Sequence, residues 1–382
     1  MSSYPVSVVV DQNTLRRRGV GLRALDPERA SPGYTLFTPI TSQGEVYLID
    51  LEGAVVHQWT LPFPPGRHAK LLPNGNLFYQ GKQVHAEPIY PLWGVVHGGI
   101  LAEVDPKGTV IRSVQHPFHH HDAAVLANGN LLVNAVESLS AAFARRIKGG
   151  LPGSEAPGGA IYGDVVYEMT WSGEVVWRWS AAEHLDPDQY PLDQYYEREH
   201  WPMCNSVNEL RDGSVILGYR SASSVIIVDR RTGDVTWRLG PPMLAQQHYP
   251  HELASGNILI FDNGSYRAGE NVPFSRVIEV ERTTQRIVWE YRDDPLQNFY
   301  SPYMSSAQRL PNGNTLIAEG SFGRIFEVTP DHEAVWEYVV PFFGRFGPGV
   351  GVASSSGEQN AIFRAYRYSP AEVPWLARGG SR

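Results

Sequence analysis

Short hydrophobic runs separated by turn residues recur along the whole chain. In residues 247–264, one apolar run, a turn at Gly256-Asn257 and a second apolar run follow one another. Runs rich in β-branched and aromatic residues, bounded by Gly, Pro, Asn or Asp, are typical of β-strands. No stretch of the sequence keeps a helical periodicity of apolar positions. The pattern therefore predicts an all-β protein built from hairpins.

The same hairpin returns at intervals, which indicates a repeat architecture. Each copy begins with a polar strand head, followed by a strand, a tight turn and a second strand. The heads are His68 (or its neighbour Arg67), His121, Asn205, His248 and Ser305. A second hairpin follows, and in most copies it ends near a tryptophan that we expect between neighbouring units. These tryptophans are Trp59, Trp179, Trp237, Trp289 and Trp336.

Six copies of the second hairpin predict a six-bladed β-propeller with four-stranded antiparallel blades. One blade is expected to be split, with strands from residues 33–59 pairing with a C-terminal strand near residues 361–364. Such pairing of the N- and C-terminal strands closes the ring and removes free sheet edges. We expect an N-terminal arm at residues 1–32, a single propeller domain at 33–370 and a C-terminal tail at 371–382.

Propeller topology places the strand heads and the long loops on one face. The long loops are residues 81–98, 137–163, 180–204 and 292–304. The innermost strands surround a central channel, so their heads are expected to converge there, where loops on a rigid scaffold commonly carry function. Arg220 ends a second strand and emerges on the same face.

Composition and charge limit the kinds of partner and the cellular compartment that we expect for this protein. The chain has 382 residues, 42% of them hydrophobic, and a net charge of -8 without a long basic run. This charge argues against nucleic acid or an anionic membrane as the main partner. Cys204 is the single cysteine, so no internal disulfide can form. With no apolar run long enough to span a bilayer and no secretion-type leader, we expect a soluble, cytoplasmic protein.

The converging heads allow three interpretations. Neutral imidazole can attack a good electrophile while Arg and Asn stabilise developing negative charge, which predicts nucleophilic catalysis. Alternatively, His68, His121 and His248 bind a divalent transition metal in a lyase, hydrolase or oxygenase. A third possibility is a non-catalytic propeller that binds a partner protein on its loop face.

Aromatic residues in the loops favour a flat, apolar small molecule as the substrate. The expected substrate contacts are His68, His251, Tyr249, Trp201, Tyr303 and Ser305. Glu199 and His200 form a further candidate acid/base pair beside the channel.

Several segments resemble the arylsulfotransferases (aryl-sulfate sulfotransferases), which are six-bladed propellers. They are residues 32–37, 120–122, 205–207, 223–226, 247–248 and 305–317, together with Arg220. The resemblance covers about residues 30–370. It implies that a histidine takes the sulfuryl group from a phenolic sulfate and passes it to another phenol, without a nucleotide donor and without a cofactor.

The resemblance also implies roles for individual residues. His248 matches the nucleophile, while Arg220, Asn205 and His121 match residues that bind the sulfuryl oxygens. A phenol has a pKa of about 10, so phenolate is a good leaving group. The chain departs from the family pattern at Met203 and Ser221, where the family has histidine. Unlike for periplasmic members, we expect no secretion leader, and the single cysteine allows no internal disulfide.

Overall fold

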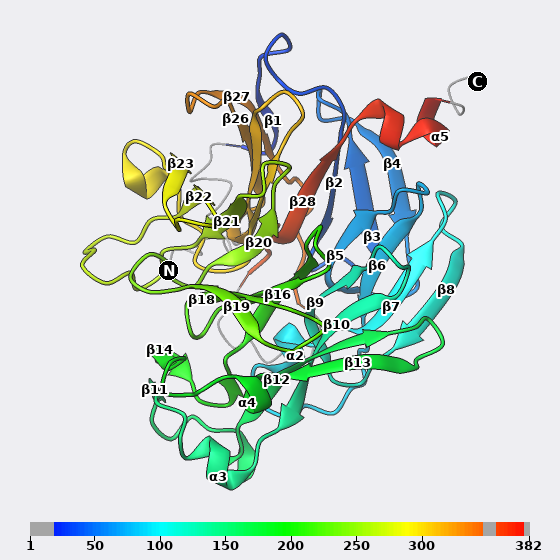
Figure 1. The fold of residues 1–382 in the computed structure, drawn as a ribbon. Helices are drawn as coiled ribbons and strands as arrows, with labels where there is room; N and C mark the ends of the chain where they lie inside the picture. The colour runs from blue at the N-terminus through cyan, green and yellow to red at the C-terminus, as the bar shows by residue number, and fades with distance from the viewer. Residues whose placement is uncertain (1–18, 347–356, 378–382) are drawn as a thin grey trace, which may run out of the picture.

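The chain forms a ring of six antiparallel, four-stranded blades (Figure 1). This computed structural model describes residues 19–346 and 357–377. Each innermost strand contacts the innermost strands of its neighbours around the central channel. The predicted fold class is therefore confirmed.

Each blade runs from an innermost strand at the channel to an outermost strand at the rim. In that order, the first comprises β28 (Ile362–Tyr368), β2 (Tyr34–Pro39), β3 (Glu45–Ile49) and β4 (Val55–Thr60). The second comprises β5 (Pro65–Leu71), β6 (Leu77–Lys82), β7 (Gly99–Val104) and β8 (Val110–Gln115). The third comprises β9 (His119–Val125), β10 (Leu131–Ser138), β12 (Tyr162–Met169) and β13 (Val175–Ser180).

The remaining blades follow the same plan. The fourth comprises β16 (Cys204–Glu209), β17 (Val215–Tyr219), β18 (Ser224–Val228) and β19 (Val235–Leu239). The fifth comprises β20 (His248–Glu252), β21 (Ile258–Asp262), β22 (Arg276–Val280) and β23 (Ile287–Tyr291). The sixth comprises β24 (Ser306–Arg309), β25 (Thr315–Glu319), β26 (Arg324–Val328) and β27 (Ala334–Val339).

Short elements occupy the connections between strands and the segment after the last strand. The helices are α2 (Trp93–Val96), α3 (Ala141–Ala144), α4 (Ala181–His184) and α5 (Pro374–Ala377). Single 3-10 turns are η1 (Pro157–Gly159), η2 (Leu296–Asn298), η3 (Gly320–Phe322) and η4 (Pro370–Glu372). Of the extra strands, β11 (Gly149–Leu151) pairs with β14 (Leu192–Glu197), and β15 (His200–Trp201) runs parallel to β12. No helix within the described ranges combines the length and hydropathy that a membrane span requires.

The two ends of the chain close the ring as predicted. β28 pairs antiparallel with β2, with Tyr34 opposite Tyr368, and Figure 1 shows the red strand beside the blue one. Part of the N-terminal arm, β1 (Gly21–Leu25), adds a fifth strand to the outer edge of the last blade by pairing with β27. Residues 1–18 and 378–382, at the ends of the expected arm and tail, lie outside the described residues.

Tryptophans of the outermost strands link neighbouring blades. The indole Nε1 of Trp59 donates a hydrogen bond to the carbonyl of Asp105 in the next blade. Trp336 likewise donates to Leu51, and so joins the last blade to the first. Trp59 and Trp336 are fully buried, whereas Trp289 is only half-buried. Each such bond fixes the position of one blade against the next.

Candidate active site in the central channel

The channel holds two cavities, one at each end. The loop-face cavity, of about 400 Å³, is lined from the long loops by residues such as Leu92 and Tyr303. The hairpin-face cavity, of about 1020 Å³, is lined by turn residues such as Leu72 and Leu253. The closing strand β28 contributes to both cavities.

The loop-face cavity gathers side chains that can act on an anion. It is lined by His121, His248, Arg67, Arg220 and Tyr303. Its remaining walls are largely apolar, from Leu92, Val95, Val96, Met203, Met304 and Phe363. Within the described part of the chain, no carboxylate side chain lines it. His121 and His248, two of the strand heads expected to converge, line this same cavity.

Backbone irregularities at the strand heads aim these side chains into the channel. His121, Met203 and Met304 have positive φ values of 54°, 62° and 59°. Such values are uncommon outside glycine and cost about 1–3 kcal/mol each. The pairing of β9 with β10 also shifts register at this end of the strand. A bulge of this kind turns a side chain out of the regular alternation, and bulges are frequent beside active sites.

Both arginines of the loop-face cavity lack an acidic partner among the described residues. Arg67 is buried and donates to the carbonyl of Val95. Burial lowers the pKa of Arg67 to about 10. Arg220 makes long hydrogen bonds to the carbonyl of Pro302, at 3.3 Å, and to Gln246 Oε1, at 3.4 Å. Arg220 is only partly buried, and its guanidinium lies over the ring of Tyr196, 4.7 Å from the centroid. Because buried charges are normally paired, the buried Arg67 without an acidic partner, beside a second such guanidinium group, favours an anion-binding site.

Hydrogen bonds fix the protonation pattern of His248. Asn263 Nδ2 donates to the carbonyls of Ser301 and Met304, so Asn263 Oδ1 faces the imidazole. His248 therefore donates its Nδ1 hydrogen to that oxygen, 2.7 Å away, and its Nε2 keeps a lone pair. The Met304 amide donates to this Nε2 at 3.1 Å. Burial and the charge of Arg220 hold the pKa of His248 well below its usual value, so the ring is neutral.

His121 lines the cavity and also contacts a buried polar cluster behind it. Its Nδ1 lies 2.7 Å from Nδ1 of His120. Burial and the neighbouring His120 hold the pKa of His121 well below its usual value. Behind His120, the ligand atoms of His120, Asp164 and His200 all lie within 4.8 Å of one another. Among the residues that the structure describes, this is the one group of three or more potential metal ligands so close together.

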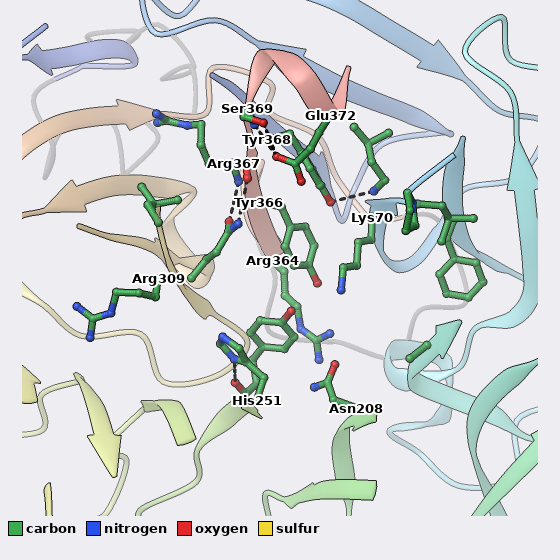
Figure 2. A pocket seen from close by; sticks show the side chains of 18 of the residues that line it. Lys70, Asn208, His251, Arg309, Arg364, Tyr366, Arg367, Tyr368, Ser369 and Glu372 are labelled. Carbon is green, nitrogen blue, oxygen red and sulfur yellow. Dashed lines mark hydrogen bonds between the residues drawn. The ribbon is translucent and has the colours of Figure 1, made fainter. Parts of the chain in front are cut away.

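Three of the predicted site residues lie in the other cavity. His68, Tyr249 and His251 line the hairpin-face cavity, which Figure 2 shows with His251, Asn208 and Arg364 around it. His68 Nε2 contacts Asp122 Oδ1 at 2.9 Å. The expected metal site of His68, His121 and His248 thus draws on both cavities, since His121 and His248 line the loop-face cavity and His68 lines the other. Successive residues of a strand face opposite ways, and here Arg67, not His68, lines the loop-face cavity.

Three other predicted residues line neither cavity. Trp201 is fully buried and donates its Nε1 hydrogen to the carbonyl of Tyr190. Ser305 Oγ donates to Ser301 Oγ, and the amide of Gly320 donates to Ser305 Oγ in turn. Asn205 Nδ2 donates to the carbonyl of Gln247. Asn205 thus holds the backbone next to His248 and does not face the cavity.

Sequence reasoning named Arg67 only as an alternative to His68 at the strand head, and it gave no role to Met304 or Phe363. Arg67 precedes His68, the predicted strand head, and β-strand alternation is the signal that separates the two. Phe363 enters the channel only because β28 closes the ring, and its ring centroid lies 6.2 Å from that of His248. Glu199, one of the suggested acid/base pair, accepts a hydrogen bond from the amide of Leu92, and burial raises its pKa to about 7.

Comparisons with known proteins agree with this architecture. A search of curated proteins found no match. A Bacteroides caccae protein of unknown function is 12% identical, with a TM-score of 0.52 over 88% of this chain and 98% of that one. A catalytically inactive virginiamycin B lyase from Staphylococcus aureus, solved with quinupristin, is 9% identical, with a TM-score of 0.47 over 85% and 89%. The first of these likenesses shows a shared fold alone.

The family comparison covers most of the chain. The sequence profile of the family described as Arylsulfotransferase (ASST) matches residues 68–341. This span includes His121, His248 and Arg220 of the loop-face cavity, whereas Arg67 lies one residue before it. The chain belongs to the arylsulfotransferase family.

Proposed function

We propose that the protein transfers a sulfuryl group from an aryl sulfate to an aromatic hydroxyl acceptor in the loop-face cavity. The observation that carries this proposal is the pair of unpaired guanidinium groups, Arg67 and Arg220, beside the neutral imidazole of His248. A singly charged sulfate ester supplies the missing negative charge. The apolar walls suit the aromatic ring, because small-molecule sites are mostly apolar with a few placed polar groups.

Binding precedes chemistry in this scheme. The sulfate oxygens lie between Arg67 and Arg220, where guanidinium groups donate charge-assisted hydrogen bonds to them. The ring packs against Phe363 and Met203. A cavity of about 400 Å³ has room for one aromatic ring with its sulfate. Fixed donors in a largely apolar site stabilise the charge that develops during transfer.

Transfer then follows two displacements at sulfur. The Nε2 lone pair of His248 attacks sulfur, the bond from sulfur to the phenolic oxygen breaks, and phenolate leaves with the electron pair. The acceptor oxygen next attacks sulfur, the sulfur–nitrogen bond breaks, and its electron pair returns to Nε2. Asn263 Oδ1 stabilises the intermediate ring by accepting its Nδ1 hydrogen. Ping-pong kinetics follow from this order.

The amide of Met304 must release Nε2 before attack. This exchange costs about 1 kcal/mol, the net contribution of an ordinary hydrogen bond. The freed amide can then donate to a sulfuryl oxygen, as backbone amides do in oxyanion holes. The scheme uses no cofactor and no nucleotide donor.

A transfer assay with matched variants tests the proposal. The donor is 4-nitrophenyl sulfate, and the acceptors are a panel of phenols. His248→Ala should abolish transfer while the protein remains folded. His251→Ala removes an imidazole three residues along the same strand but in the hairpin-face cavity, so it should retain transfer. Full activity of His248→Ala, or no transfer by the wild type with any acceptor, overturns the proposal.

Two other functions make different predictions for the same preparations. A metal-dependent enzyme requires a transition metal in protein purified without added metal, which elemental analysis measures. A non-catalytic binding module predicts neither phenol release nor transfer.

A further inference from the structure

A closed cluster of His120, Asp164 and His200 lies outside both channel cavities. The ligand atoms of the three side chains all lie within 4.8 Å of one another, and none of the three residues lines either cavity. Asp164 Oδ1 lies 3.1 Å from His120 Nε2 and 3.0 Å from His200 Nε2. All three side chains are 0% exposed. Two imidazole nitrogens therefore face one carboxylate oxygen in a space closed to solvent.

Hydrogen bonds account for only part of this arrangement. His200 Nε2 hydrogen-bonds to Asp164 Oδ1, and the amide of Cys204 donates to Asp164 Oδ2 at 2.8 Å. His120 Nε2 lies beside the same Oδ1 atom, but it forms no hydrogen bond to any residue that the structure describes. Buried polar atoms nearly always have a partner, so one without a partner requires an explanation such as a bound ion.

The charge of Asp164 also lacks a cationic partner of the usual kind. Within the described ranges, the only basic groups at ion-pair distance from this carboxylate are the two imidazoles, and no Lys or Arg is among them. Buried charges are normally paired with an opposite charge or coordinate a metal. The carboxylate and the unsatisfied imidazole nitrogen thus indicate the same kind of ligand, a cation.

The other ring nitrogen of each histidine is held by a neighbouring side chain. His200 Nδ1 lies 3.1 Å from the hydroxyl of Tyr90, and His120 Nδ1 lies 2.7 Å from His121 Nδ1. In metal-bound histidines one ring nitrogen binds the ion, while the other forms a hydrogen bond that fixes the orientation of the ring. The two Nε2 atoms, which both face Asp164, are therefore the atoms placed to bind an ion.

We propose that His120 Nε2, His200 Nε2 and Asp164 Oδ1 bind a divalent transition-metal ion, for which Zn²⁺ is the best fit. Ligand atoms about 2.1 Å from a tetrahedral ion lie roughly 3.4 Å apart. The observed separations of 3.0 and 3.1 Å are close to this value. In zinc sites with two imidazoles and one carboxylate, a water molecule takes the fourth position.

The ligand types and the burial of the cluster exclude other common ions. Mg²⁺ and Ca²⁺ prefer sites built from oxygen atoms alone, whereas two of these three ligands are nitrogens. Two histidines and a carboxylate also bind iron in oxygenases, but those sites keep open positions for their substrates. This cluster lines neither cavity, so it offers no such position. Zinc in a structural role is compatible with both features.

The ion joins segments that are far apart in the chain. His120 lies on β9 and Asp164 on β12, whereas His200 lies on β15, a short strand in the loop of residues 180–204. A shared ion therefore ties this loop to the third blade. Because His120 contacts His121, the ion also supports one wall of the loop-face cavity. No step of the proposed transfer passes through the ion.

Elemental analysis tests the proposal without an activity assay. The protein is produced without a metal-affinity tag, dialysed against Zn²⁺ and then against metal-free buffer, and its bound metal is measured. The wild type should retain about one equivalent of zinc per chain, and Asp164→Asn and His200→Gln should each retain less than about a tenth. Less than about a tenth of an equivalent in the wild type overturns the inference, because a hydrogen bond between Asp164 and His200 then suffices.

Two control variants test the position of the ion. His119 is the neighbour of His120 on β9 and is equally buried, and its Nε2 also lacks a hydrogen-bond partner, but no acidic group lies at ion-pair distance from it among the described residues. His119→Gln should therefore keep the zinc. His248→Ala should keep it as well, because His248 lines the loop-face cavity and supplies no ligand. Loss of zinc from His248→Ala places the ion in that cavity and overturns the inference.

Measurements on the wild type keep the proposal testable if a buried variant does not fold. X-ray absorption at the zinc edge should show only nitrogen and oxygen ligands, at about 2.0–2.2 Å. A sulfur ligand at about 2.3 Å would indicate Cys204 and contradict the proposed ligand set. Removal of the zinc with a chelator should lower the thermal midpoint, and adding zinc back should restore it, because an ion bound only by the folded state stabilises that state. A midpoint that does not change when the zinc is removed contradicts the tie between loop and blade.

The outcome for the metal is independent of the outcome for the transfer reaction. If the wild type binds zinc but transfers no sulfuryl group, only the proposed function fails. If it transfers the group but binds no zinc, only the metal site fails.

Discussion

Replacing Arg67 with methionine should make the protein more stable and less active. Burial lowers the pKa of Arg67 from 12.5 to about 10. Because the folded-state pKa lies below the unfolded one, the charged guanidinium opposes folding at every pH below about 10. The difference corresponds to about 3 kcal/mol at neutral pH. Methionine fills similar volume without that charge.

Two opposing effects determine the size of the change. The variant also loses the hydrogen bond to the carbonyl of Val95, and leaving that acceptor unpaired costs about 1–2 kcal/mol. We therefore expect the free energy of unfolding to rise by about 1–2 kcal/mol in the empty protein. Hydrogen bonds to charged groups contribute about 1.5–3 kcal/mol, so kcat/KM should fall roughly 10- to 100-fold.

Arg324→Met is the matched control. Arg324 is 7% exposed and Arg67 6%, but Arg324 pairs with Glu337 at 3.1 Å and Glu319 at 3.3 Å. Breaking a buried ion pair costs about 3–5 kcal/mol, so this variant should lose stability and keep its kcat/KM. Thermal or denaturant unfolding and steady-state kinetics measure both quantities. An Arg67→Met variant that is less stable and fully active would refute the assignment of Arg67 as an unpaired anion-binding residue.

Further predictions concern pH and the scaffold. The pKa values of His121 and His248 lie well below 6.5, so both imidazoles stay neutral as the pH falls. The value of kcat/KM should therefore stay level from pH 8 to about 6 and decline only below that. A decline of kcat/KM centred at pH 6.5 would contradict the direction of these pKa shifts. Trp336→Phe removes one inter-blade hydrogen bond and should lower the unfolding free energy by about 1 kcal/mol without changing kcat, as denaturation and kinetics would show. Asp122→Asn removes the carboxylate that pairs with Arg364 at 2.7 Å between buried side chains and should destabilise the protein by about 3–5 kcal/mol, seen as a lower thermal midpoint.

The fold was accessible from sequence because its signals are local. Turn chemistry, strand alternation and the recurring tryptophan each lie within a few residues, and their repetition predicts the blade and the closure of the ring. The face that carries the long loops follows from that topology alone. His121, Arg220 and His248 could be placed together for this reason.

The other site residues could not be predicted, because their positions depend on structural features that differ from blade to blade. Which of Arg67 and His68 faces the loop-face cavity depends on bulges at the strand heads, which no local pattern marks. Phe363 reaches the channel through ring closure. The cluster of Asp164 and His200 joins separate segments, and the sequence alone does not bring them together.

The most direct test of the central claim is to trap the covalent intermediate. Wild-type protein is mixed with 4-nitrophenyl sulfate without acceptor, quenched rapidly, digested and analysed by mass spectrometry. The account predicts one sulfuryl group on the peptide that carries His248, formed as fast as phenol is released and lost when a phenol is added. Phenol release without any adduct, or an adduct on a different residue, would contradict it.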